Sequence, residues 1–150
     1  MFNDLTWRES ERKVQEYMKN CGYKVLMTNF SCVGVELDII ATLSKSVQKK
    51  QMKKETQKRM LEDKSNRKIY KNSFKNALKE LKDLLVITEV KGRENDKFGK
   101  GLEQISEQKK HNIIRGARYL QKDKRFEKYQ IRFDVASVDN GEITYIENAF

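Results

Sequence analysis

Two pairs of charged residues interrupt stretches of the sequence that otherwise suit buried strands. Glu36 and Asp38 lie in GVELDIIATL, and Glu89 and Lys91 lie in LLVITEVK. Because alternate side chains of a strand share a face, we expect Glu36 to point with Asp38, and Glu89 to point with Lys91. If the two strands are neighbours with matching faces, Asp38, Glu89 and Lys91 converge, with Glu36 close by.

Two carboxylates and a lysine are groups that suit hydrolysis of a phosphodiester bond. A bound Mg²⁺ (or Mn²⁺) neutralises the anionic oxygens around the phosphorus and activates water. Mg²⁺ keeps several waters, so we expect the carboxylates of Asp38 and Glu89 and the backbone carbonyl of Val90 to suffice as ligands. Lys91 then orients or deprotonates the attacking water, or offsets charge on the phosphate. The residues therefore predict a metal-dependent nuclease.

A plainer interpretation of the same residues is a solvated strand face. In a chain that is 36% charged, many strands expose carboxylates and lysines. The metal site is favoured because both pairs interrupt hydrophobic strands, where a charged side chain costs desolvation energy unless it has a partner.

Hydrophobic periodicity predicts the elements that position these residues. Thr6 and Glu9 suit a capping box at the start of a helix that ends at Gly22. A second helix is predicted within residues 102–120, and strands are predicted at residues 23–30, 34–43, 84–91, 131–138 and 143–146. The order is helix, three strands, helix, two strands. It indicates one mixed α/β (α+β) domain with a sheet core over residues 1–150.

Residues 44–82 do not belong to this order and are interpreted as an insertion between the second and third strands. They hold fourteen Lys or Arg and four Asp or Glu, whereas the rest of the chain has eighteen of each sign. We expect the first half to be mobile and the stretch from Ile69 to Leu85 to be partly helical. The insertion either shields the site or adds a basic arm that contacts phosphates. Because it supplies the whole net charge, the charge does not argue for nucleic-acid binding by the core.

Composition argues against several other classes of protein. The first residues carry charge and lack the apolar run of a signal peptide, and no eighteen consecutive apolar residues occur. We therefore expect a cytoplasmic protein without a membrane partner. Cys21 and Cys32 lack the second pair that a structural zinc requires, and reduced thiols are favoured over a disulfide.

Three basic residues around the Phe98-Gly99 turn are candidates for nucleic-acid binding: Arg93, Lys97 and Lys100. They can contact backbone phosphates, although single lysines in loops are commonly just solvated. The sole histidine, His111, is assigned no role. The aromatic residues of the last strands suit a core better than a base-stacking platform, so sequence-specific reading of RNA is not indicated.

Several motifs in the same chain order resemble the YraN family of small bacterial proteins. They are GVELDIIA, TEVKGR, FG, a helix with a lysine, RFDVASV and the ending IENAF, from about Glu11 to Phe150 and interrupted only by the insertion. That family is grouped with the PD-(D/E)XK endonuclease-like fold and resembles Holliday-junction resolvases. The resemblance implies a restriction-endonuclease-like core with a mixed sheet of about five strands flanked by helices, in the order α-β-β-β-α-β-β.

The resemblance also implies roles for single residues. Asp38 and Glu89 match the metal ligands, and Lys91 matches the catalytic lysine. Three further residues match auxiliary positions: Glu11 on the first helix, Glu36 beside Asp38, and Lys109 on the helix after the third strand. Three residues depart from the usual pattern, since Ser10 and Val35 stand where glycine is frequent and Gly92 stands where a small polar residue is common. None of them removes a proposed ligand.

Three functions stay open. The first is a metal-dependent endonuclease acting on DNA, including branched or damaged DNA, and by analogy with resolvases it would be a homodimer. The second is a catalytically inactive module on the same fold that binds nucleic acid or a protein. The third is a role in RNA metabolism, since a fold does not fix the substrate.

Overall fold

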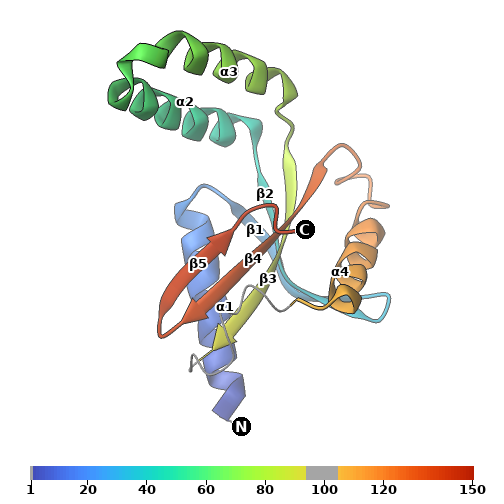
Figure 1. Cartoon of the computed structure of the whole chain (residues 1–150). Coiled ribbons are helices and arrows are strands. Elements are labelled where there is room, and N and C mark those ends of the chain that lie inside the picture. The colour runs from blue at the N-terminus through green and yellow to red at the C-terminus, as the bar shows by residue number, and fades with distance from the viewer. Residues whose placement is uncertain (1, 94–104) are drawn as a thin grey trace.

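The computed structural model describes residues 2–93 and 105–150, apart from the side chains of residues 2–5 and 93. The elements are α1 (Phe2–Asn20), β1 (Lys24–Cys32), β2 (Val35–Leu43), α2 (Lys45–Glu62), the short 3-10 helix η1 (Lys64–Asn66), α3 (Arg67–Glu80), β3 (Leu84–Arg93), α4 (Glu107–Leu120), β4 (Gln130–Asp139) and β5 (Glu142–Ile146) (Figure 1). The predicted mixed α/β fold around a sheet of about five strands is confirmed.

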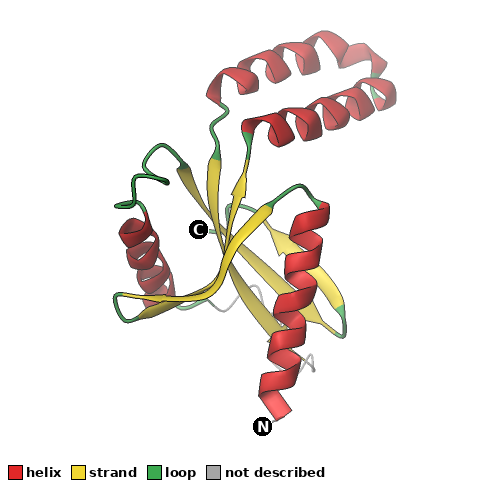
Figure 2. Ribbon diagram, turned by 180° about the vertical axis from the view of Figure 1, so that it is seen from behind, coloured by secondary structure: helices red, strands yellow, loops and turns green. Residues whose placement is uncertain are grey.

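The five strands form one sheet in the order β1-β2-β3-β4-β5. Neighbouring strands are antiparallel except β3 and β4, which are parallel. A parallel pair needs a long crossover, and the chain between β3 and β4 contains α4. Helix α1 lies on one face of the sheet and α4 on the other (Figures 1 and 2). The sheet is therefore the middle of three layers.

Each face of the sheet has its own hydrophobic core. On the α1 side, Val14 and Met18 pack in a cluster with residues such as Ile39 and Val90. On the α4 side, the cluster combines Ile113, Ala117 and Leu120 with Leu37, Ile40, Leu85 and Ile87. Apolar residues on both faces explain why the strands read as nearly continuous hydrophobic runs.

Helix α1 begins earlier than the capping box predicts. The helix starts at Phe2, so Thr6 lies inside it and the predicted N-cap is wrong, because a capping residue has a non-helical backbone. The predicted end is confirmed. Gly22 has φ 88°, its N–H bonds to the carbonyl of Lys19, and the N–H of Tyr23 bonds to the carbonyl of Met18. These two bonds form a Schellman motif that only a residue tolerant of positive φ closes easily.

The insertion forms two antiparallel helices, α2 and α3, which we call the arm (residues 44–82) (Figure 1). Both halves are helical, whereas the sequence predicted a helix only in the later half. Lys, Gln, Glu, Met and Arg favour helix, and the Ser44 hydroxyl caps α2 by accepting the N–H of Val47. The arm leaves the sheet between Leu43 and Leu84, which remain paired across β2 and β3. The insertion therefore does not separate the two strands.

In the part of the chain that the structure describes, no helix combines the length and the apolar character needed to cross a membrane.

Candidate active site

Asp38 lies where strand β2 separates from β3. The pairing of these strands runs from Leu43↔Leu84 to Ile39↔Thr88 and stops there. Beyond that point the carboxylate of Asp38 accepts the N–H of Val90 at 2.9 Å. A side chain thus takes the place of the backbone partner, and β2 and β3 are no longer paired beyond this level. We call this unpaired place between the two strands the opening.

The alternation of side chains along β2 slips by one residue at Asp38. Leu37 and Ile40 are three residues apart, yet both pack in the cluster on the α4 side, while Ile39 packs on the α1 side. A regular strand would place Leu37 and Ile39 on one face. Glu36 does not share the burial of Asp38, because its side chain is exposed to solvent. Glu36 and Asp38, which the sequence predicts to share a face, therefore differ in their exposure to solvent.

Asn29 marks the same irregularity on strand β1. The pairs Thr28↔Ile39 and Phe30↔Leu37 flank it, so the register places Asn29 opposite Asp38, but these two residues are left out of the pairing. Asn29 has φ 48°, a left-handed conformation that asparagine tolerates better than most residues. The β1–β2 hairpin is thus kinked at one level, with Asn29 on one strand and Asp38 on the other.

Glu11 of α1 holds this kink from the α1 side of the sheet. Its Oε2 accepts a hydrogen bond from Asn29 Nδ2 at 3.0 Å, and the residue is only 4% exposed. Its other oxygen, Oε1, is buried and has no hydrogen-bond partner among the described residues. Burial of a carboxylate costs desolvation energy, and the one hydrogen bond from Asn29 offsets this cost only in part.

Glu89, Lys91 and Lys109 meet on the α4 side of the sheet. The Glu89 carboxylate is 5% exposed, and its Oε1 lies 3.9 Å from Lys91 Nζ and 3.4 Å from Lys109 Nζ. Lys109 is the third residue of α4, and its N–H donates to the Ser106 hydroxyl that caps the helix. The cap fixes the start of α4 and thereby places Lys109 beside Glu89.

Asp38 and Glu89 are close enough to perturb each other. Burial raises the pKa of Asp38 from 3.8 to about 8, and the charge of Glu89 and a hydrogen bond to it contribute to the rise. The N–H of Val90 and the charge of Lys109 oppose this rise in pKa. Two buried carboxyl groups side by side, with cations nearby, are an arrangement that favours either a shared proton or a bound cation.

The donor set fits a hard divalent cation that keeps part of its water shell. In the described residues, no three Asp, Glu, His or Cys side chains converge on one point, so side chains supply two oxygen ligands at most. The backbone of Val90 adds a third candidate. A residue in a strand directs its N–H and C=O to the same side, so the Val90 carbonyl faces β2, as its N–H does. Two carboxylates, one carbonyl and waters suit Mg²⁺ or Mn²⁺.

The structure brings together most of the site residues that the sequence predicts. Asp38, Glu89, Lys91, Lys109 and the backbone of Val90 lie around the opening between β2 and β3. Glu36 faces solvent, and Glu11 acts from the opposite side of the sheet. Strand β3 ends at Arg93, whose side chain is outside the described residues, as are Lys97 and Lys100.

Sequence reasoning missed a buried polar network that joins β3, β4 and the C-terminal residues. Asp134 is fully buried, forms a bidentate pair with Arg132 at 2.8 and 2.7 Å, and accepts hydrogen bonds from the Tyr145 hydroxyl and the N–H of Asn148. The Tyr145 hydroxyl also lies 3.0 Å from the Thr88 hydroxyl. The sequence signal for this network was the charged pair Arg132 and Asp134, two residues apart inside an apolar strand. The same kind of signal identified Glu89 and Lys91.

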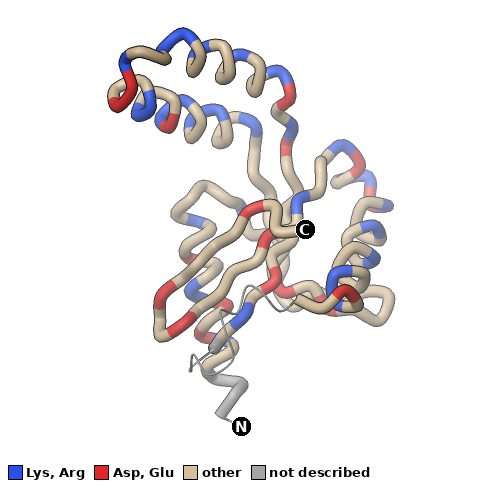
Figure 3. The backbone as a smooth tube through the Cα atoms, in the orientation of Figure 1, with Lys and Arg blue, Asp and Glu red and all other residues tan. Residues whose placement is uncertain are grey.

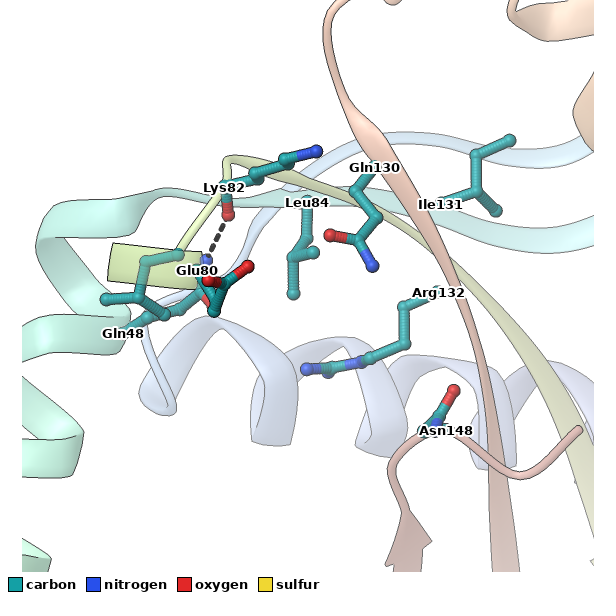
Figure 4. Close-up of a pocket in the computed structure, with 9 residues that line it drawn as sticks. Gln48, Glu80, Lys82, Leu84, Gln130, Ile131, Arg132 and Asn148 are labelled. Carbon is teal, nitrogen blue, oxygen red and sulfur yellow. Dashed lines mark hydrogen bonds between the residues drawn. The ribbon is translucent and has the colours of Figure 1, made fainter. Parts of the chain in front are cut away.

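A cavity of about 280 Å³ lies apart from these carboxylates, at the base of the arm (Figure 4). Its lining residues come from the arm, the adjoining strands and the C-terminal stretch: Gln48, Glu80, Leu81, Lys82, Leu84, Gln130, Ile131, Arg132 and Asn148. Neither Asp38 nor Glu89 contributes to it. The two carboxylates therefore lie outside this cavity.

Similarity to known proteins extends over nearly the whole chain. The family described as Uncharacterised protein family UPF0102 matches residues 10–138, a range that includes all residues around the opening. A UPF0102 protein of Persephonella marina is 28% identical over 150 residues, which cover 100% of this chain and 97% of the relative. One of Clostridium acetobutylicum is 30% identical over 146 residues, with 93% and 88% covered. One of Legionella pneumophila is 44% identical over 69 residues, with 44% and 58% covered.

Proposed function

Because the chain belongs to the uncharacterised protein family UPF0102, the family also called YraN that its motifs resemble, we propose a function from the site itself: a metal-dependent nuclease that hydrolyses phosphodiester bonds, with DNA as the favoured substrate. The observation that carries the proposal is the pair of buried carboxylates at the strand kink. Asp38 and Glu89 are 4% and 5% exposed, and two lysines lie beside them.

In this proposal each residue around the opening has a distinct task. A bound Mg²⁺ or Mn²⁺ supplies Lewis-acid activation of water and neutralises charge on the phosphate. Asp38, Glu89 and the Val90 carbonyl would hold the ion. Lys91 Nζ, whose side chain is 28% exposed, reaches the opening and orients the attacking water or donates to a phosphate oxygen. Lys109 holds the carboxylate of Glu89 in position from the capped end of α4.

The second candidate is an inactive module on the same fold that binds nucleic acid or a protein. One observation favours it: both lysines already lie within 4 Å of the Glu89 carboxylate and balance its charge without a metal. For catalysis, a metal ion must compete with these lysines for the Glu89 carboxylate. Binding of nucleic acid or of a protein without catalysis requires no such competition. The candidates therefore differ in whether a divalent cation binds at Asp38 and Glu89.

The test is cleavage of labelled linear, nicked, flap and four-way-junction DNA and of structured RNA in Mg²⁺ or Mn²⁺. We compare the wild type with Asp38→Asn, Lys91→Ala and the control Glu36→Gln. The asparagine introduced by Asp38→Asn can still accept the Val90 N–H, so a loss of activity in that variant reports the ligand and not the fold. We expect cleavage to fall at least about 100-fold in the two site variants, the scale on which single catalytic groups act, and to persist in Glu36→Gln.

Either of two results would sink the nuclease proposal. One is that no substrate is cut under any condition while the protein is folded. The other is that Asp38→Asn and Lys91→Ala cut as fast as the wild type. Both results would leave the inactive binding module as the better account of the site.

A further inference from the structure

The arm carries the whole net positive charge of the protein on one protruding element. It holds fourteen Lys or Arg and four Asp or Glu. The basic residues are distributed along the length of both helices (Figure 3). Among the described residues, Arg59 is its one basic side chain in an ion pair, with Glu55 at 3.1 Å. A high density of cations without anionic partners is unfavourable by self-repulsion, and it is relieved when a polyanion binds.

The basic residues of the arm form rows and not a random scatter. On α2, lysines recur every four residues, which keeps them on one side of the helix: Lys45, Lys49 and Lys53, and beside them Lys50, Lys54 and Lys58. From η1 along α3 and just past its end, a second row follows helical spacing: Lys64, Lys68, Lys71, Lys75, Lys79 and Lys82. Eighteen helical residues span about 27 Å, close to the rise of eight base pairs at about 3.4 Å each.

The arm is anchored to the core at its base. Gln48 Nε2 donates to the carbonyls of Leu43 and Lys82, and Gln51 Nε2 donates to the carbonyl of Cys21. The Asp83 carboxylate accepts the N–H of Lys45 at 2.8 Å. These bonds tie α2 to both strand ends and to the turn after α1, so the arm presents its charges in a fixed direction.

The apolar side chains of the arm mostly lie between its two helices. Met52, Met60, Phe74 and Leu78 are half-buried on this inner side, and Tyr70 bonds through its hydroxyl to Asp63. Tyr70 and Phe74, the two aromatic residues of the arm, are both half-buried, which leaves little ring surface on which a single-stranded base could stack. Apart from Leu61 and Ile69 near the tip, the arm also lacks the exposed apolar face with which basic helices enter a bilayer. Lysines without stacking partners suit the backbone of a duplex.

The arm and the candidate active site lie on the same two strands. The arm leaves the sheet after Leu43 and returns at Leu84, and Asp38 and Glu89 each lie five residues further along. Five residues of strand span about 17 Å, which is half of one turn of duplex DNA. One duplex can therefore contact the arm and the opening at Asp38 together.

We propose that the arm is a sequence-independent docking surface for the phosphate backbone of duplex nucleic acid. The identity of the polyanion rests on the proposed nuclease function, but docking requires no metal and no cleavage. The arm holds the duplex by its phosphates beside the strand kink. The lysines carry no base-reading geometry, so the surface does not select for a sequence.

The test is binding of a fluorescently labelled DNA duplex of about 20 base pairs in EDTA, where no cleavage occurs, at salt concentrations from about 50 to about 200 mM. The arm variant replaces four exposed lysines by glutamine: Lys49, Lys53, Lys68 and Lys75. The matched control makes the same replacement at four exposed lysines of the core: Lys19, Lys24, Lys122 and Lys124. Both variants remove four charges, so they differ only in where the charge was removed.

We expect the arm variant to bind the duplex at least about ten-fold more weakly at about 50 mM salt. The slope of log K, where K is the binding constant, against the logarithm of the salt concentration should become less negative by up to about 3.6. This is about 0.9 for each phosphate that the arm no longer neutralises. The control should keep the slope of the wild type. Replacement of the same four arm lysines by arginine should restore binding, because docking depends on charge.

Two results would overturn the inference. One is that the arm variant and the control bind the duplex equally well. The other is that the wild-type protein binds vesicles of 3:1 phosphatidylcholine and phosphatidylserine but does not bind duplex DNA. Failure of the nuclease proposal has a different signature. In that case the duplex binds through the arm in EDTA, but it is not cut when Mg²⁺ or Mn²⁺ is added.

Discussion

The carboxylate of Asp38 accepts the backbone N–H of Val90 at 2.9 Å, where a regular antiparallel sheet would have a backbone carbonyl. This bond holds Asp38 beside Glu89 and keeps the Val90 carbonyl pointed into the same opening. The candidate site therefore depends on a local failure of strand pairing. The pKa of Asp38, the backbone of Asn29 and the contact of α1 with β3 each have measurable consequences.

The stability of the metal-free protein should fall as the pH rises from about 4 to about 8. The pKa of Asp38 is about 8 in the folded state and 3.8 ordinarily, so between these values the folded protein binds a proton that the unfolded chain has lost. The stabilising effect is complete below about pH 4 and is lost as the pH passes about 8. Urea unfolding in EDTA at pH 5.5, 6.5, 7.5 and 8.5 measures the slope, at most about 1.4 kcal/mol per pH unit from one group.

Asp38→Asn is the control for this slope, because it keeps an acceptor for the Val90 N–H and removes the titration. Identical slopes in the wild type and Asp38→Asn would contradict the raised pKa of Asp38. For the same reason, Mn²⁺ should raise the Tm of the wild type more at pH 8.5 than at pH 6.5, since a ligating carboxyl group must first lose its proton.

Asn29→Ala should destabilise the protein by about 2–5 kcal/mol. Alanine in a left-handed conformation costs about 1–2 kcal/mol, and the loss of the Asn29 amide leaves a buried Glu11 carboxylate without its hydrogen bond, at about 1–3 kcal/mol. Chemical denaturation measures the change. Asn29→Gly is the matched variant, since it removes the same hydrogen bond but tolerates the positive φ, and we expect it to be less destabilising than Asn29→Ala. If alanine and glycine were equivalent there, the kink would not depend on the backbone of Asn29.

Ser10 and Gly92 should compensate for each other. A Cβ at Gly92 would lie 2.8 Å from Ser10 Oγ and 3.3 Å from Ser10 Cβ, so Gly92→Ala forces a shift where α1 crosses β3. We expect Gly92→Ala to cost about 1–3 kcal/mol by overpacking and Ser10→Gly to recover part of that stability. A double-mutant cycle measures the coupling, which should exceed about 0.5 kcal/mol. Additive effects would mean that α1 simply moves away. Both residues depart from the pattern of the resembled family, and the structure places these two departures next to each other.

Asp134→Ala should be among the most destabilising single changes outside the hydrophobic core. Asp134 is fully buried and pairs with Arg132, so its removal leaves a largely buried guanidinium without its main partner, at about 3–5 kcal/mol. Arg132 retains a contact with Glu147 at 3.6 Å, but the Glu147 side chain is 60% exposed and compensates little. Thermal unfolding of Asp134→Ala beside Asp123→Ala, whose ion pair with Arg125 is on the surface, makes the comparison. Similar Tm values for the two variants would contradict a structural role for the network.

The sequence by itself predicted the five strands, helices α1 and α4, and Asp38, Glu89 and Lys91 as the centre of the candidate site. Hydrophobic runs predicted the five strands, because a sheet covered by helices on both faces buries both sides of its strands. Glu89 and Lys91 could be placed on one face because β3 is regular, and the spacing of two suffices there. The basic composition of the arm predicted an insertion, although its first half proved helical because Lys- and Gln-rich segments form helices when a partner helix covers their few apolar residues.

Only the tertiary structure decided what happens at Asp38. Val35 and Leu37 pack against α4 at Gly116, where a Cβ would lie 2.9 and 3.1 Å from their side chains, while Ile39 packs on the opposite face. Accommodating both contacts breaks the alternation of β2 between Leu37 and Ile39, next to the buried Asp38, whereas Glu36 lies before the break and is exposed. An inference from the spacing of residues in the sequence requires a regularly pleated strand. The break in the alternation of β2 arises from packing against α4, which is distant along the chain. The same long-range packing places Lys109 nearer than Lys91 to the Glu89 carboxylate.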